Sequence, residues 1–236
     1  MIPLQIAPEP TSFAEKVRRP GENALACMAG EPLPHRRLGR PITAKKKVGK
    51  HEVAKTIDDF PYWQECLDDL HEAYRGICAY YCFRVEKAAL PQVDHFVAKA
   101  VPGPTLAYEW SNFRLACGYA NTCKNDFPGV LDPATISAGE FVLDLLNLRV
   151  SPSSSLTGNR RDDVAQTIDR LKLNEGRALE VRHHAMEHFR AGRVTLDFLE
   201  QDHPFLAAEL ARQGVHSAAQ LPTLPAALLA VVEPEL

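Results

Sequence analysis

The stretch from Val93 to Asp126 constrains the fold more than any other part of this 236-residue chain. It reads VDHFVAKAVPGPTLAYEWSNFRLACGYANTCKND, and its candidate site residues are Asp94, His95, Asn112, Asn121 and Lys124. Neighbouring residues on a regular strand point to opposite faces. Asp94 and His95 can therefore share one site only where the strand ends, twists or bulges. We expect a strand ending at this pair, a loop containing YEWSN, a second strand at FRLAC, and a helix after it.

These five residues have the types that phosphodiester hydrolysis requires, namely an activator of water and groups that stabilise charge on phosphorus and on the leaving oxygen. His95 suits a general base, because the pKa of an ordinary histidine, about 6.5, lies near working pH. Asp94 and Asn121 offer hard oxygen ligands to an ion such as Mg²⁺. Asn112 can hold the imidazole or a neighbouring loop through its amide. Lys124, three residues after Asn121 and on the same helix face, can offer a positive charge to a phosphate.

The ordered pattern VDHF, YEWSNFRLAC and N..K resembles the HNH family of nucleases, whose fold is called the His-Me or ββα-metal finger. The resemblance implies that His95 is the general base and that Asp94 and Asn121 bind one divalent ion, Mg²⁺ or Mn²⁺. It also implies that Asn112 is structural, and Lys124 matches a lysine common just after the last motif position. The implied activity is that of an endonuclease acting on DNA. Cleavage of RNA, such as tRNA, stays open because the motif recognises a phosphodiester and not a sugar.

Two further segments, CAYYC upstream and TIDRLKLNEGRALEVR downstream, resemble the branch of HNH proteins that includes the nuclease partner of the Septu anti-phage system. In that system the HNH protein is coupled to an ATPase. The resemblance implies an anti-phage defence effector with an ATPase partner. The alternative is a non-catalytic assembly module, in which the finger is a scaffold and the partner ATPase carries the activity.

Related proteins of this branch often carry two C-x-x-C pairs that bind a structural Zn²⁺. In this chain Cys78 and Cys82 stand one residue too far apart, and Cys117 and Cys123 have Ala120 where a thiolate is expected. Four thiolates could still form a tetrahedral zinc site with unusual loops. We favour the other interpretation, in which the cysteines are small buried hydrophobic residues.

The first part of the chain, residues 1–57, is rich in proline and lacks sustained periodicity, which predicts an arm. It contains a run of basic residues with no acidic residue between them. These residues are Arg36, Arg37, Arg40, Lys45, Lys46, Lys47 and Lys50. The run is either a solvated linker or a surface that contacts nucleic-acid phosphates without sequence preference. Because the chain has a net charge of −3, any attraction to nucleic acid must come from such a local patch.

We predict an α+β fold, mainly helical, with a central ββα-metal finger. The predicted regions are the arm at residues 1–57, the nuclease core at 58–130, and a helical C-terminal region at 131–236 that packs on the core. Apolar residues at helical spacing predict a helix from Pro61 to Gly76, helices in DDVAQTIDRLKLNEGRALEVRHHAMEHF, and a helix over 195–212 with a break at Pro204. GICAYYCFRVE predicts a short β segment, and EFVLDLLNLRV a strand or a short helix. We expect the apolar tail from Leu221 to pack on the body.

No segment has the pattern of a secretory signal, and the apolar run LPAALLAVV is far shorter than the roughly 20 residues that a membrane span needs. We therefore expect a cytoplasmic protein with reduced thiols and no membrane partner.

Overall fold

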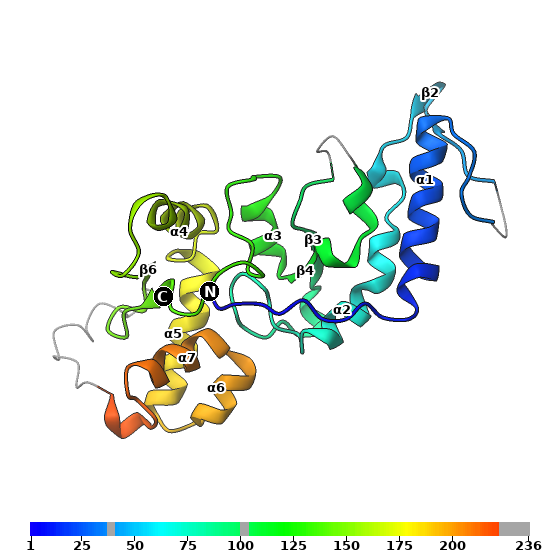
Figure 1. Ribbon diagram of the computed structural model, residues 1–236. Coiled ribbons are helices and arrows are strands. Elements are labelled where there is room, and N and C mark those ends of the chain that lie inside the picture. The colour runs from blue at the N-terminus through cyan, green and yellow to red at the C-terminus, as the bar shows by residue number, and fades with distance from the viewer. Residues whose placement is uncertain (37–40, 100–103, 222–236) are drawn as a thin grey trace.

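The computed structural model describes residues 1–36, 41–99 and 104–221, and these form a mixed α+β fold (Figure 1). The helices are α1 (Arg19–Ala29), α2 (Leu67–Ala73), α3 (Gly118–Lys124), α4 (Gly158–Arg170), α5 (Gly176–Arg190), α6 (Leu196–Asp202) and α7 (Pro204–Arg212). Three antiparallel hairpins accompany them: β1 (Lys45–Val48) with β2 (His51–Ala54), β3 (Gln92–His95) with β4 (Phe113–Ala116), and β5 (Phe141–Leu143) with β6 (Val150–Pro152). Within these residues no helix is both long enough and apolar enough to cross a bilayer.

Two hydrophobic cores lie on either side of the β3–β4 hairpin. One contains the aromatic residues Phe13, Trp63, Tyr108 and Phe113 and lies beside α1 and α2. The other contains apolar side chains of α4, α5 and α7, such as Met186. In Figure 1 the β3–β4 hairpin and α3 occupy the middle of an elongated molecule, between the N-terminal helices and the C-terminal ones. The central hairpin therefore has packed structure on both sides.

Most of the predicted helices are present. A 3-10 helix at Tyr62–Cys66 continues into α2, which ends at Ala73. Arg75 (φ 51°) and the predicted terminator Gly76 (φ 72°) follow with positive φ, and the Gly76 amide donates to the His71 carbonyl. The predicted helix over 195–212 is two helices, α6 and α7, because the residue before a proline avoids the helical conformation. The ambiguous run EFVLDLLNLRV begins the β5–β6 hairpin. The tail after Leu221 lies outside the described residues.

The segment predicted as an arm, residues 1–57, contains regular elements that its lack of periodicity did not indicate. A π-helical turn at Ala14–Arg18 leads directly into α1, and the side chains of Phe13 and Val17 are fully buried. Phe13 packs edge-on against Trp110, with 5.6 Å between ring centroids. Two large apolar residues four apart are enough to anchor a helix when a core receives them. That core is built from distant residues, so local periodicity did not reveal it.

The prediction of a β segment at GICAYYCFRVE is also wrong. Only Ile77 and Arg84 pair, through an isolated bridge, and the residues between them form a turn. Cys82 adopts a left-handed conformation (φ 54°) in this turn. The aromatic residues that suggested a strand are buried because the turn inserts them into the core.

Candidate active site

The β3–β4 hairpin and α3 follow one another in the order that the sequence predicts. Asp94 pairs with Arg114 and His95 pairs with Phe113 across the hairpin, and β3 ends at His95. Two residues after Ala116, the last residue of β4, α3 begins, and it packs against β3. Both residues are paired in the ladder, and their side chains have different neighbours. Asp94 contacts Tyr80 and Lys124, whereas His95 contacts Trp63 and Phe113.

Asp94, His95 and Asn121 line one cleft with a volume of about 1130 Å³. Its wall also includes Trp63 from the 3-10 helix and Lys99 from the segment after β3. The cleft thus combines the end of a strand, one face of a short helix and an aromatic wall. The sequence predicted that these three residues would lie at one site, and the structure places all three on the wall of this cleft.

The His95 imidazole is held in one orientation. Its Nε2 lies 2.9 Å from the carbonyl oxygen of Ala107, and since a carbonyl can only accept, Nε2 carries the hydrogen. Trp63 and Phe113 contact the ring edge-on, with centroid distances of 4.9 and 5.0 Å. Burial lowers the pKa of His95 to about 4, so the imidazole is neutral at neutral pH. The lone pair of this neutral ring resides on Nδ1.

The Nδ1 atom of His95 has no hydrogen-bond partner among the described residues. The His95 side chain is largely buried, but it forms part of the cleft wall. A neutral imidazole with one nitrogen fixed and the other open can accept a proton from water.

The Asp94 carboxylate is buried and held from two sides. The Tyr80 hydroxyl donates a hydrogen bond to Oδ2, and the Lys124 ammonium lies 3.2 Å from Oδ1. Burial raises the pKa of the Asp94 carboxyl, while Lys124 and Tyr80 act in the opposite direction. Burial also raises the pKa of Tyr80 well above its usual value, so its hydroxyl keeps the proton that it donates. Tyr80 is a site residue that the sequence reasoning missed, because CAYYC was interpreted as a strand.

Lys124 does not have the role that the sequence predicted. Its side chain is 1% exposed, and its ammonium also donates to the carbonyl oxygens of His95 (2.9 Å) and Asn125 (3.4 Å). A buried and fully bonded ammonium cannot reach a phosphate in the cleft. Lys124 instead connects α3 to the end of β3 and offsets the charge of Asp94. Lys99 is the lysine that lines the cleft, where its Nζ lies 4.4 Å from the Trp63 ring centroid.

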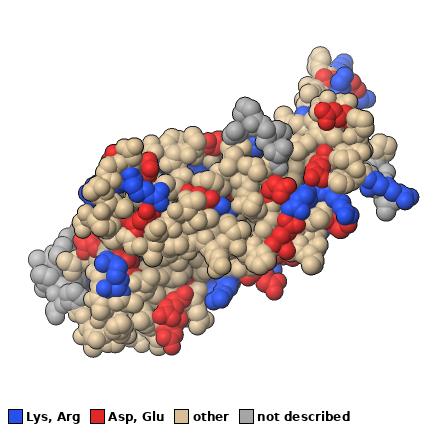
Figure 2. Space-filling model, viewed as in Figure 1, with Lys and Arg blue, Asp and Glu red and all other residues tan. Residues whose placement is uncertain are grey.

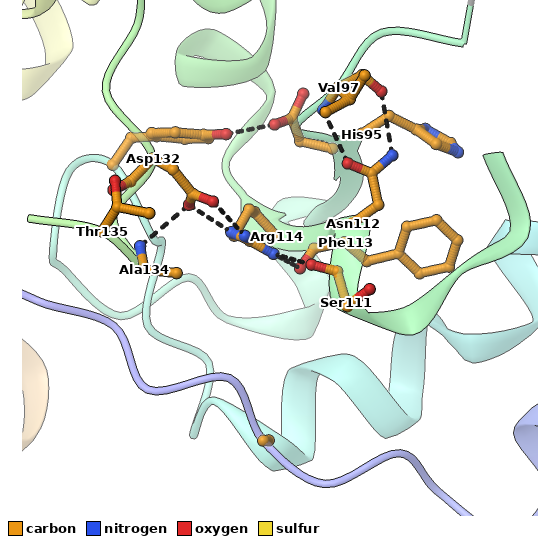
Figure 3. A network of polar contacts seen from close by, with 12 residues as sticks. His95, Val97, Ser111, Asn112, Phe113, Arg114, Asp132, Ala134 and Thr135 are labelled. Carbon is orange, nitrogen blue, oxygen red and sulfur yellow. Dashed lines mark hydrogen bonds and ion pairs between the residues drawn. The ribbon is translucent and has the colours of Figure 1, made fainter. Parts of the chain in front are cut away.

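Asn112 holds the segment that crosses over between the two strands. Its Oδ1 accepts from the Val97 amide (2.8 Å), and its Nδ2 donates to the Val97 carbonyl (3.0 Å), as Figure 3 shows. Nδ2 also donates to the Leu106 carbonyl (3.0 Å). All the hydrogen bonds of the buried side chain go to the backbone, and none goes to the His95 ring. Of the two roles that the sequence allowed, the structure therefore favours fixation of the loop.

A second polar anchor was not anticipated from the sequence. Arg114 on β4 is 3% exposed and forms a bidentate ion pair with Asp132, at 2.9 and 2.6 Å. Its remaining nitrogen donates to the carbonyls of Ser111 and Phe113, as Figure 3 shows. Such a paired guanidinium fixes β4 to the chain segment that follows α3. The signal in the sequence was a charged residue within an otherwise apolar strand.

The Asn121 side chain is half-buried, and its Nδ2 donates to Gln92 Oε1 (2.8 Å), while its Oδ1 has no hydrogen bond to another described residue. An ionised carboxylate has about four acceptor positions, so Asp94 keeps capacity beyond its two hydrogen bonds. These are hard oxygen donors of the kind that Mg²⁺ and Mn²⁺ prefer, and such ions commonly keep several waters. The donor set therefore fits one divalent ion of this type. Within the described parts of the chain no three His, Cys, Asp or Glu side chains gather as a metal site.

The four cysteines considered for zinc do not form one group. Cys78 and Cys117 are neighbours, with the Cys117 amide 3.4 Å from Cys78 Sγ, and their contact lowers the pKa of Cys117 to about 7. Cys82 donates to backbone carbonyls, including that of Ala79, at 3.9 Å. Cys123 accepts from the Tyr81 hydroxyl at 3.9 Å. Two of the thiols lie together, and the other two bond elsewhere.

The basic residues of the N-terminal segment are in part exposed. Lys45, Lys47 and Lys50 are on or next to the β1–β2 hairpin with exposed side chains, and Arg36 is also exposed. Lys46 is different, since its ammonium pairs with Asp59 at 2.5 Å. The remaining two, Arg37 and Arg40, lie outside the described residues.

No protein-family model matches this chain, and no curated protein matches it.

Proposed function

We propose that this protein is a metal-dependent endonuclease of the HNH type, in which β3, β4 and α3 form a ββα-metal finger. The observation that carries the proposal is the shared cleft, which a neutral imidazole and two hard oxygen donors line together. His95 acts as the general base, and Asp94 and Asn121 are the ligands of Mg²⁺ or Mn²⁺. The favoured substrate is DNA.

The roles of the side chains follow from their contacts. The hydrogen bond from His95 Nε2 to Ala107 keeps the ring in one tautomer, so that Nδ1 accepts a proton from water. Tyr80 and Lys124 hold the Asp94 carboxylate in place at the cleft. A bound divalent ion would supply the positive charge that stabilises the phosphate and the departing 3′ oxygen. Trp63 and Phe113 keep the imidazole neutral by excluding water from most of its surface.

The test is cleavage of supercoiled plasmid in Mg²⁺, Mn²⁺ or EDTA by wild type and by His95→Ala. Loss of a general base typically costs about 10²–10⁴-fold in rate, and we expect that loss with the fold retained in circular dichroism. His216→Ala, a change of an exposed histidine far along the chain, is the matched control and should cut at the wild-type rate. Equal rates for His95→Ala and wild type would show that His95 is not the base.

Radiolabelled tRNA in the same reactions separates a DNA nuclease from an RNA nuclease, because the cleft chemistry serves both. The ATPase partner and the role in anti-phage defence stay predictions from the sequence resemblance. Isolation of a stable complex with an ATP-binding protein, combined with no cutting by the isolated chain in any metal, would favour the assembly module instead.

A further inference from the structure

The β1–β2 hairpin carries positive charge that the described acidic groups leave largely unpaired. Residues 45–55 contain five lysines and one glutamate. Of these lysines only Lys46 forms an ion pair with a described acidic residue, Asp59. The ammonium groups of Lys45, Lys47 and Lys50 have no partner among the described residues. An unpaired cluster of this sign attracts phosphates.

The described residues of the hairpin are mostly exposed. Every residue of β2 is exposed, and in β1 only Lys46 is half-buried. The apolar side chains of Val48 and Val53 are 55% and 37% exposed, although hairpins usually bury such residues on one face. A lone two-stranded hairpin is marginally stable in water. Figure 1 shows the hairpin at one end of the molecule, and in Figure 2 blue lysine or arginine atoms are visible at that end.

The base of the hairpin lies next to the candidate active site. The Lys46–Asp59 ion pair ties β1 to the segment that precedes α2. Asp58, the neighbour of Asp59, lines the cleft and pairs with Lys99, another residue of the cleft wall. A nucleic acid bound along the hairpin therefore passes beside the residues that line the cleft.

We propose that the β1–β2 hairpin inserts into the major groove of duplex DNA and holds the substrate for the cleft, an inference that rests on the proposed nuclease function. A strand of four residues is about 13 Å long, and the major groove of B-form DNA, about 12 Å wide and 8.5 Å deep, admits a two-stranded ribbon. The register places Lys45 and Lys47 on one face, together with Glu52 opposite Lys47. Val48 and His51 lie on the other face with Lys46, whose ion pair with Asp59 holds the start of that face to the body. The lysines contact phosphates, and the second face contacts base edges. The major groove of A-form RNA is too narrow and deep for such a ribbon.

The test is fluorescence anisotropy with a labelled DNA duplex in EDTA, over a series of salt concentrations. The variant Lys45→Gln/Lys47→Gln/Lys50→Gln should bind more weakly, and the slope of log affinity against log salt should fall by about 2–3, since each phosphate contact contributes about 0.9. The control removes the same charge from exposed lysines of other elements. It is Lys16→Gln/Lys87→Gln/Lys172→Gln, and it should keep the wild-type slope.

The groove is tested with modified duplexes. DNA whose cytosines carry a bulky glucosyl group in the major groove should bind wild type at least about tenfold more weakly, the size of one lost base-edge contact. Netropsin, which fills the minor groove, should have little effect, and duplex RNA should bind more weakly than DNA. An unchanged salt slope in the hairpin variant, or inhibition by netropsin and not by glucosylation, would overturn the inference. Because the assay contains EDTA and measures no cleavage, a protein that binds through the hairpin but cuts nothing would refute only the nuclease proposal.

Discussion

Acidification should destabilise this protein through His95, and the structure gives the size of the effect. The folded-state pKa is about 4 and the ordinary value is 6.5, so the unfolded chain takes up the proton first as the pH falls. The stabilisation that depends on neutral His95 is therefore present above about pH 6.5 and is lost progressively as the pH falls to about 4. One pKa unit corresponds to about 1.4 kcal/mol, so the difference between the folded and unfolded pKa values of His95 corresponds to roughly 3 kcal/mol. Roughly 2 kcal/mol of it should be lost between pH 7 and pH 5.

The measurement is urea unfolding of wild type and His95→Gln at pH 7 and pH 5, with EDTA present so that metal binding does not contribute. Glutamine can still donate a hydrogen bond to Ala107, but it cannot titrate. The other titrating groups, including His183 and His203, whose pKa values burial also lowers, act in both proteins and cancel. The free energy that wild type loses between the two pH values should exceed the loss of the variant by roughly 2 kcal/mol.

Equal losses in the two proteins would refute the reasoning, because His95 would then titrate in the folded state as it does in the unfolded chain. The imidazole would then be solvated, and it would not be a neutral ring buried between Trp63 and Phe113. A change in the urea dependence (the m-value) between variants would indicate altered compactness, so the comparison uses conditions in which the m-values agree.

Two further predictions concern the groups that hold Asp94. Tyr80→Phe removes the hydroxyl that bonds to Asp94, and it should weaken Mn²⁺ binding by about 10–100-fold in titration calorimetry, as losses of outer-sphere partners do. The control is Tyr81→Phe, which should bind Mn²⁺ like wild type because the Tyr81 hydroxyl bonds to the Leu171 carbonyl. Equal Mn²⁺ affinities of wild type and Tyr80→Phe would exclude a positioning role for Tyr80. Lys124→Met should lower the free energy of unfolding by about 3–5 kcal/mol in urea, because it leaves the buried Asp94 carboxylate without its ionic partner. A variant as stable as wild type would mean that this ion pair does not form.

The parts of the site that the sequence predicted are those that depend on local order. The strand ending at Asp94 and His95, the returning strand at Phe113, and the helix with Asn121 are all consequences of short-range patterns. The contacts that hold these residues could not be predicted in the same way. Tyr80 reaches Asp94 from a turn that lies outside the hairpin, and no local periodicity marks that turn.

The wrong prediction for the role of Lys124 has a related cause. An isolated lysine beside a candidate site suggests contact with substrate, since lysines are rarely buried unless paired. Here the pairing partner, Asp94, lies thirty residues earlier in the chain and becomes a neighbour only when α3 packs on β3. The same reasoning accounts for α1, whose anchor Phe13 meets Trp110 only in the folded protein. Short-range patterns identify the elements, and the burial of charged residues depends on how those elements pack.

The charges of the cleft and of the hairpin suggest a division of tasks. Asp58, Glu65, Asp94 and Asp126 line the cleft, against one lysine in its wall. A phosphate that entered this cleft without a cation would meet net negative charge, and the interaction would be repulsive. The lining therefore suits a divalent ion better than it suits nucleic acid alone. In the proposed nuclease, attraction for DNA must then come from elsewhere on a chain whose net charge is −3. Among the described residues the unpaired lysines of the β1–β2 hairpin are placed to supply it, so binding and hydrolysis would depend on separate groups that lie next to one another.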